Sequence, residues 1–361
     1  MKTKINEDTV TWIYGTGTFA IRVAEILDRL GWQIKGFIDH IPKANFSVNG
    51  KNYAVEKCSD VEFNLDSQVI LGICNPHGNL INIKKNIHSV NPNTNVITPV
   101  ELVDFLRCKD ILLENYWLGA SREFYAQHNQ EIMDFRSMLE DSDSKKLFDQ
   151  ILKYRIDGQL EELPLPDPLR EHYLPQGIET PPINLRALDL GACQGEDIEA
   201  FLESGRFFEF GIFLEPDLAN FDLLVKKIAV LELRNVSVWP LASWSDVEIL
   251  SFASKKDASS NLSKDGLEKI QAIRLDSVLS ATSINYIKMD IEGAEMETLR
   301  GASHLISQQC PHLAISVYHK PEDIWSLGLY VDSIATSKYR FYLRIYGHQT
   351  FETVLYCVPR N

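Results

Sequence analysis

The sequence has no run of apolar residues long enough to cross a bilayer, which takes roughly 18 to 20 in succession. Its first segment, MKTKINEDTVTW, is too polar to contain the apolar core of a secretory signal. The six cysteines form no CxxC pair and have no histidine at zinc-ligand spacing. We therefore expect a cytoplasmic protein without a membrane span, with thiols that are reduced and mostly buried.

Positive charge is also scarce. Lysine and arginine together number 36 against 50 aspartate and glutamate residues, so the net charge is −14. A phosphate backbone would be repelled on average, and we do not expect a nucleic-acid partner. Nothing in the sequence specifies an oligomeric state.

What the sequence has is alternation of apolar strand-like runs with helical patterns, in two separate regions. With 361 residues the chain is long for one core, since single domains usually hold roughly 100 to 200 residues. Residues 1–100 read as a small Rossmann-like domain, because β-α-β patterns imply a parallel sheet covered by helices. Residues 101–182 read as a helical connector with proline-rich punctuation, and residues 183–361 as a second α/β domain.

The second domain contains seven strand candidates, of which the last two lack a helix between them. A short GHQT turn joins these two, so we expect an antiparallel hairpin, because parallel partners need a crossover of a dozen or more residues. The expected architecture is a mostly parallel seven-stranded sheet that ends in one antiparallel hairpin. This is the usual arrangement of the class I methyltransferase fold.

Two strand ends of this domain suggest a nucleotide-type site. The first strand runs into DLGACQGED, with Asp189, Gly191 and Gly195 at the turn into a helix, where glycines let the backbone approach a ligand closely. The second strand ends in FLEPD, which places Glu215 about twenty residues beyond the glycine turn, where an acid can accept the hydroxyls of a ribose. A tight turn that merely needs small residues, and a solvated acid that caps the helix near Asp217, are the alternatives.

A third strand end carries the segment INYIKMDIEGAEMETLRGA. Its Asp290 comes directly after the strand and should face the ligand crevice at the carboxyl edge of the sheet. Glu292 and Glu295 are expected in the first turn of the next helix, where the helix dipole favours acids.

These segments, together with RLDSVL, HLAISVYHKPEDIW and FYLRIYGHQTFETVLYCVP, resemble the FkbM-type family of S-adenosylmethionine-dependent methyltransferases over residues 183 to 359. The resemblance implies a class I domain that methylates a hydroxyl of a glycan, sugar nucleotide or small natural product. It also implies cofactor-binding residues, which are Asp189, Gly191 and Gly195 at the methionine end, Glu215 at the ribose, Ala242 and Ser243 at the adenine, and Asp290.

A base need only remove the hydroxyl proton of the acceptor, and the candidates at the correct edge are Asp290, Glu292 and His319. An ordinary histidine pKa near 6.5 suits a proton acceptor at neutral pH, so we assign His319 as the base. We assign Asp290 to orient the hydroxyl or to contact the cofactor. No dedicated metal site is expected, because the acids lack the convergent spacing of a divalent cage. Arg155 and Tyr173 of the connector are expected to close over the acceptor.

In the first domain, WIYGTGTFAIRVAEIL is a strand followed by a GxGxxA turn with Gly15 and Gly17, and Asp39 lies about twenty residues further on. This matches the dinucleotide-binding pattern in spacing and context. The region is also similar to the nucleotide-sugar-binding domains at the front of bacterial sugar acetyltransferases, which makes a nucleotide or sugar nucleotide the expected ligand. A domain that binds nothing and serves in docking is the alternative.

The sequence thus predicts an O-methyltransferase with S-adenosylmethionine as cofactor. Two other classes stay open at this point. One is a non-catalytic protein that binds nucleotides in both domains, and the other is an NAD-dependent oxidoreductase built on the first domain.

Overall fold

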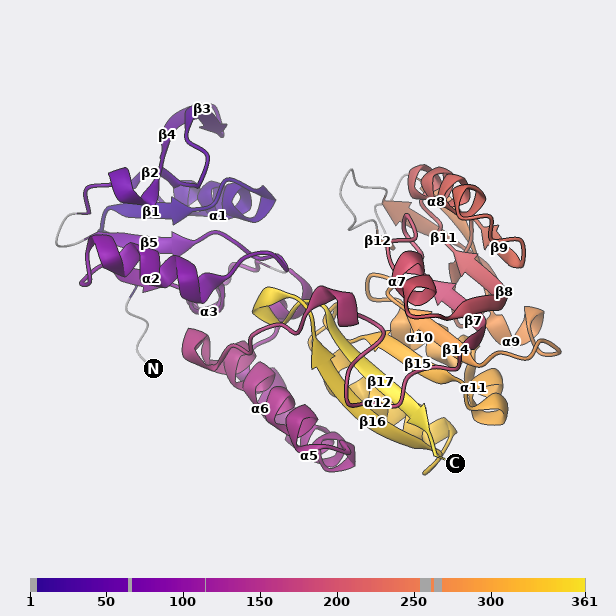
Figure 1. The fold of residues 1–361 in the computed structure, drawn as a ribbon. Helices are drawn as coiled ribbons and strands as arrows, with labels where there is room; N and C mark the ends of the chain where they lie inside the picture. The colour runs from indigo at the N-terminus through magenta and orange to yellow at the C-terminus, as the bar shows by residue number, and fades with distance from the viewer. Residues whose placement is uncertain (1–4, 64–66, 114, 254–260, 263–267, 361) are drawn as a thin grey trace. The chain divides into compact units, whose positions relative to one another are not determined.

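The computed structural model describes residues 5–63, 67–113, 115–253, 261–262 and 268–360. The chain forms two compact units (Figure 1). Unit 1 comprises residues 1–126, 149–165 and 347–351, and unit 2 comprises residues 127–148, 166–346 and 352–361. Residues of the expected connector, 101–182, therefore belong partly to one unit and partly to the other.

Unit 1 contains a six-stranded sheet and the helices that accompany it. Its elements in chain order are β1 (Thr11–Tyr14), α1 (Thr18–Arg29), β2 (Ile34–Ile38), β3 (Lys43–Val48), β4 (Lys51–Glu56), β5 (Gln68–Leu71), α2 (Leu80–Val90), β6 (Asn95–Ile97) and α3 (Pro99–Arg107). The sheet order is β3-β4-β2-β1-β5-β6, and every pairing except β3 with β4 is parallel. The expected Rossmann-like arrangement is present, with buried apolar residues of β1, β5 and α1 in its core.

Unit 2 holds the larger sheet. Its elements are α5 (Asn129–Met138), β7 (Asn184–Leu190), α7 (Ile198–Glu203), β8 (Phe207–Leu214), α8 (Leu218–Val230), β9 (Val236–Trp239), β10 (Ala242–Ser243), β11 (Glu248–Ala253), β12 (Asn261–Leu262), β13 (Glu268–Ile273), α9 (Leu275–Val278), β14 (Tyr286–Met289), α10 (Glu295–Gly301), α11 (Ser303–Gln309), β15 (His312–Ser316), α12 (Asp323–Ile334), β16 (Tyr339–Ile345) and β17 (Thr353–Pro359). Helices α4 (Arg122–Gln127) and α6 (Ser142–Asp157) each have residues in both units.

The seven-stranded sheet of unit 2 has the order β16-β17-β15-β14-β7-β8-β9. The central pairings are parallel, whereas β17 runs antiparallel to both β15 and β16. The prediction of a mostly parallel seven-stranded sheet with an antiparallel C-terminal hairpin is confirmed, and the hairpin is the yellow pair at one edge of the sheet in Figure 1. A second sheet, with the order β10-β13-β11-β12, was not expected from the sequence.

The sequence also led to expectations about membrane-spanning helices and about the cysteines. Within the part of the chain that is described, no helix is both long and apolar enough to cross a membrane. All six cysteines are free thiols, but only Cys357 is fully buried and Cys108 is exposed. The expectation that the thiols are mostly buried is therefore wrong.

Candidate functional site

The carboxyl ends of four neighbouring parallel strands in unit 2 bring the expected site residues to one edge of the sheet. Gly191 follows β7, Glu215 follows β8, Asp290 follows β14, and His319 follows β15. Backbone hydrogen bonds join the ends of three of these strands. Asp290 N–H donates to the Leu190 carbonyl (3.0 Å), and Gly191 N–H donates to the Leu214 carbonyl (3.0 Å). In open α/β sheets the ligand crevice lies at this edge.

The turn after β7 requires its first glycine. Gly191 has a φ of 78°, and a Cβ at this position would lie 1.9 Å from the backbone oxygen of Asp290. No side chain fits at such a distance, so glycine allows the β7 and β14 ends to approach each other. Gly195 also has a positive φ of 76°, and its absent Cβ would meet the side chains of Ile198 and Leu224 at 2.7 and 2.8 Å.

Glu215 is a buried acid tied to the same turn. Its Oε2 accepts the backbone N–H of Cys193 (2.8 Å) and its Oε1 accepts the backbone N–H of Asp217 (2.8 Å). Only 6% of the residue is exposed, and burial raises the pKa of its carboxyl to about 7. The helix α8 is capped by Asp217 itself, whose Oδ1 accepts from Ala219 and Asn220. The alternative of a solvated, helix-capping Glu215 is therefore wrong.

Asp189 lies on β7 and forms an ion pair that the sequence did not reveal. Its Oδ1 is 3.0 Å from the ammonium of Lys288, which occupies the paired position on β14. Burial raises the pKa of Asp189. Lys288 favours the ionised carboxylate and so lowers this pKa, but burial has the larger effect. A lysine inside the apolar strand INYIKMD was the signal that could have revealed this pair, since a buried ammonium must be matched.

Asp290 lies within reach of two phenol hydroxyls and one imidazole. The hydroxyl of Tyr173 donates to its Oδ2 (3.1 Å), and the hydroxyl of Tyr318 lies 3.4 Å from its Oδ1. His319 Nε2 is 3.4 Å from the same Oδ1. Of the two connector residues that were expected to close over the acceptor, Tyr173 lies at this site, whereas Arg155 belongs to unit 1.

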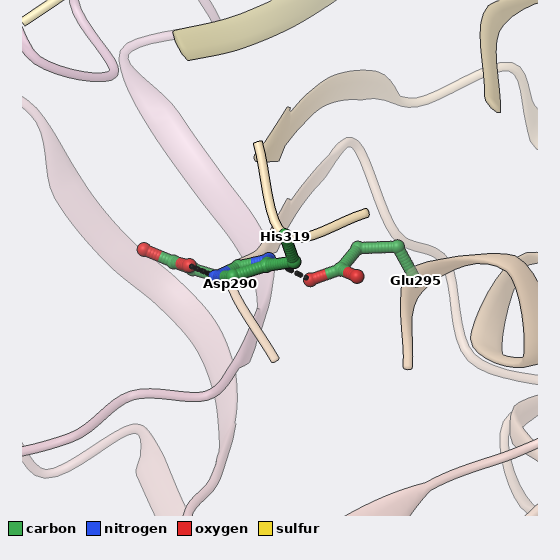
Figure 2. A group of neighbouring side chains, drawn as sticks. All are labelled: Asp290, Glu295 and His319. Atoms are coloured by element: carbon green, nitrogen blue, oxygen red, sulfur yellow. Dashed lines mark hydrogen bonds and ion pairs between the residues drawn. The ribbon is translucent and has the colours of Figure 1, made fainter. Parts of the chain in front are cut away.

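The imidazole of His319 lies between carboxylates on both of its sides, as Figure 2 shows. Its Nδ1 is 2.9 Å from Oε1 of Glu295, and its Nε2 lies 3.8 Å from Oε2 of Glu292 in addition to the contact with Asp290. Burial disfavours the charged imidazolium, but the three carboxylates outweigh burial and raise the pKa of His319 well above 6.5. The assignment of His319 as the base depended on an ordinary histidine pKa, and the surroundings of His319 do not give it one.

Of the two glutamates after Asp290, only one lies in the first turn of the next helix as expected. Helix α10 begins at Glu295, and Glu292 lies in the preceding turn with a φ of 53°. Glu295 has no exposed surface, and its Oε1 accepts the backbone N–H of Ile291 (3.0 Å) beside the contact with His319. Glu295 thus lies in the first turn of α10 as expected but is also a buried partner of the histidine, whereas Glu292 precedes the helix instead of starting it.

Comparison with known proteins identifies this part of the chain. Residues 189–349 match the family model for the methyltransferase FkbM domain, which includes every strand end described above. The chain carries an FkbM methyltransferase domain. The resemblance seen in the sequence and the methyltransferase class of the enzyme are confirmed.

A solved structure agrees with this assignment at the level of the fold. The crystal structure of methyltransferase FkbM from Methylobacillus flagellatus KT superposes with a TM-score of 0.75 at 18% identity, covering 97% of this chain and 90% of that one. Aeropyrum pernix fibrillarin, solved with natively bound S-adenosyl-L-methionine, reaches a TM-score of only 0.32 at 10% identity, covering 52% of this chain and 73% of that one, which supports no statement about this chain. A comparison with curated proteins gave no match.

The expected adenine-side residues of the FkbM domain form the short strand β10. The Ser243 hydroxyl lies 2.8 Å from the hydroxyl of Thr298 on α10, and both Ser243 and Ala242 are buried. Ala242 packs with Ile270 and Ala272 in a small core cluster. Contact of Ala242 and Ser243 with an adenine stays a prediction.

Two further acids lie near Asp290 and His319. Glu352 Oε1 lies 3.4 Å from the Tyr318 hydroxyl, whose one proton is shared between Glu352 and Asp290, and Asp323 accepts the backbone N–H of Lys320 at 2.8 Å. Burial, followed by neighbouring acid charge, raises the pKa of both carboxyls well above the ordinary range. Neither has a signal in the sequence, because both come from segments distant from DIEGAE in the chain.

One group of side chains at this edge has metal-ligating atoms close together. One such atom from each of Asp290, Glu295 and His319 lies within 4.8 Å of the others. The two imidazole nitrogens face different carboxylates, so one ion cannot use both of these contacts. A cation on Nε2 would be held with Asp290, while Glu295 would orient the ring from behind, as carboxylates commonly do for metal-bound histidines.

In unit 1, the loops after β1 and β2 bring the expected nucleotide-site residues together. Gly15 directly follows β1 and has a φ of 106°, and Gly17 immediately precedes α1 without a side-chain cap. The Thr16 hydroxyl donates to Asp39 Oδ2 (2.7 Å), and the Lys43 ammonium lies 3.1 Å from the same hydroxyl. The N-terminus of α1 has no acidic residue in its first turn, which suits an anionic group.

Proposed function

We propose that this FkbM methyltransferase uses S-adenosylmethionine to methylate a hydroxyl of a glycan, a sugar nucleotide or a small natural product. The observation that carries the proposal is the joint position of Glu215, Gly191 and Asp290 at one sheet edge. A buried carboxylate beside a glycine turn can accept the ribose hydroxyls of a nucleoside cofactor. Asp290 on the next strand along the sheet provides a carboxylate for the acceptor.

Methyl transfer to a hydroxyl is an in-line displacement at the methyl carbon. The bond from carbon to the acceptor oxygen forms as the bond from carbon to sulfur breaks, which neutralises the positive sulfonium that the cofactor supplies. The acceptor oxygen loses its proton to a base on the protein. Orientation and exclusion of water therefore contribute most of the rate enhancement.

The sequence suggested His319 as the base and Asp290 as the orienting group, and we exchange these two roles. Three carboxylates raise the pKa of His319 and so favour the imidazolium, which carries a proton on both ring nitrogens and has no lone pair at Nε2 to accept another. Asp290 is a carboxylate with the hydroxyls of Tyr173 and Tyr318 and this imidazolium around it. In the proposed mechanism Asp290 receives the acceptor proton, and His319 holds Asp290 in place.

The competing functions explain less of the molecule. A non-catalytic nucleotide-binding protein and an NAD-dependent oxidoreductase both leave the Asp290 cluster without a role, and neither is a methyltransferase.

The proposal is tested by incubating the full chain with S-adenosylmethionine and a panel of hydroxylated acceptors. Release of S-adenosylhomocysteine together with a product heavier by one methyl group supports it. Binding of the cofactor with transfer to amines alone would contradict O-methylation.

Activity is expected to be independent of added metal. His319 is hydrogen-bonded to Glu295 through Nδ1 and ion-paired with Asp290 through Nε2, and S-adenosylmethionine supplies its own positive charge. EDTA should therefore change kcat by less than about twofold, a margin equal to a few tenths of a kcal/mol. Full inhibition by EDTA that is reversed by magnesium would show that the cluster is a metal site.

For unit 1 we propose a nucleotide or sugar-nucleotide site formed by Gly15, Gly17 and Asp39. Calorimetry of the full chain against a panel of nucleoside diphosphate sugars should find one that binds. Because Asp39 is only partly buried, Asp39→Ala should weaken that ligand about fivefold, as expected for a hydrogen bond worth roughly 1 kcal/mol. Asp60→Ala, which removes an exposed acid at the end of the short 3-10 helix of residues 58–60, is the matched control. Absence of binding by every member of the panel would favour the docking alternative.

A further inference from the structure

Lys288 is a buried lysine two residues before Asp290. It lies on β14, and only 5% of its surface is exposed. Its ammonium is 3.0 Å from Asp189 Oδ1, 3.3 Å from Asp197 Oδ2 and 3.3 Å from the carbonyl oxygen of Gly191. The ring of Tyr173 lies on it, with 5.1 Å from Nζ to the ring centroid.

Several of the other side chains near this ammonium are aromatic. A small cavity beside it is lined by Phe201, Phe208, Phe213 and Tyr286 together with Asp189, Asp197 and Lys288. An unpaired charge in such a place would cost several kcal/mol, so the position of the ammonium depends on its two carboxylates. Burial opposes the charge of Lys288, but Asp189 and Asp197, together with the more distant Asp290, outweigh it and raise its pKa well above 10.5.

The three groups that contact the ammonium belong to different segments at the carboxyl edge of the seven-stranded sheet. Asp189 is the last charged residue of β7, Gly191 begins the glycine turn, and Asp197 immediately precedes α7. One ammonium therefore links the end of β14 to both ends of the segment from Asp189 to Asp197. A shift of Asp189, Gly191 or Asp197 would displace the backbone that faces the ligand crevice.

We propose that Lys288 is a positioning residue for methyl transfer, which holds the segment from Asp189 to Asp197 in the form that receives the amino-acid end of S-adenosylmethionine. The inference rests on the proposed function, because it takes this cofactor as the ligand of the glycine turn. Lys288 itself lies beneath the turn and acts through Asp189, Gly191 and Asp197.

The test compares two ligands that differ only at the end in question. S-adenosylhomocysteine carries the amino-acid group, whereas 5′-methylthioadenosine has the same adenosine and sulfur without it. In Lys288→Met, calorimetry should show at least about a tenfold loss of affinity for S-adenosylhomocysteine, corresponding to 1.4 kcal/mol. Affinity for 5′-methylthioadenosine should change less than about twofold. Lys269→Met, which removes an exposed ammonium on β13 that contacts Ser251, is the matched control and should leave both affinities unchanged.

Lys288→Met leaves the Asp189 carboxylate buried without its partner, which can prevent folding. We therefore also compare Asp189→Asn with the double variant Asp189→Asn/Lys288→Met. Residue 189 is neutral in both proteins, so the comparison isolates the effect of Lys288. The double variant should bind S-adenosylhomocysteine more weakly than Asp189→Asn and bind 5′-methylthioadenosine equally well.

Equal losses for both ligands, or no loss for either, in a folded variant would show that Lys288 has a structural role only and overturn the proposal. Failure of the wild-type protein to bind S-adenosylhomocysteine at all is a different result. It would overturn the proposed function, and this inference with it.

Discussion

Replacing Asp290 with asparagine should lower kcat by about a hundredfold to ten-thousandfold while the affinity for S-adenosylmethionine changes little. A positioned proton acceptor typically contributes that much to a reaction. Asparagine keeps the shape of the side chain and can still accept from Tyr173, whose hydroxyl lies 3.1 Å from Oδ2 in the wild type. It cannot take up a proton. Single-turnover kinetics with saturating cofactor, beside calorimetry of cofactor binding, separates these two effects.

Two further variants establish which group is the base. Glu292→Gln removes the neighbouring acid and should keep kcat within about threefold of wild type, because Glu292 is 3.8 Å from His319 and only supports it. His319→Gln removes the imidazolium that holds Asp290 and should cost about tenfold at most. If His319→Gln loses at least a hundredfold while Asp290→Asn stays within tenfold of wild type, the histidine is the base. If Glu292→Gln is as inactive as Asp290→Asn and folds normally, Glu292 has that role.

The sequence predicted the parallel sheets well because their strands are buried on both faces and appear as continuous apolar runs. It did not lead us to the β3–β4 hairpin, although the turn contains Asn49 and Gly50, both with positive φ (51° and 76°). Asn-Gly between strands is a strong signal for such a turn. The exposed residues of β3 hid it, since four of its first five positions are exposed. The sheet of β10 to β13 was missed in part because β10 and β12 have only two residues each, too few for a recognisable pattern.

For the site, the sequence indicated which residues meet but not their protonation. The alternation of strand and helix placed Gly191, Glu215, Asp290 and His319 at one edge, because topology alone decides this. Whether an acid such as Glu295 lies in solvent or beneath a histidine depends on tertiary packing. A first-turn acid has the same local pattern in both cases. The raised pKa of His319 follows from that packing, so it could not be obtained from the motif.

Replacing Glu215 should have the largest effect on cofactor binding. Its carboxylate is held by the backbone N–H groups of Cys193 and Asp217, which fixes its orientation before any ligand arrives. Losing a charged acceptor costs about 1.5 to 3 kcal/mol, roughly tenfold to a hundredfold in affinity. Calorimetry of Glu215→Ala with S-adenosylmethionine should show this loss. Glu209→Ala, which removes an exposed acid on the same strand, is the control and should bind normally.

The pH dependence of binding gives an independent measure of the same residue. Burial raises the pKa of Glu215 to about 7 in the protein without ligand, and the ionised carboxylate is the form that accepts both ribose hydroxyls. The affinity of the wild type should therefore rise with pH up to about 7 and fall about tenfold for each pH unit below that value, because each unit then removes nine-tenths of the ionised form. Glu215→Gln has no such titration, and its weaker affinity should lose this dependence. An unchanged affinity in Glu215→Ala, or the same pH slope in Glu215→Gln as in the wild type, would show that the ribose is held by another group.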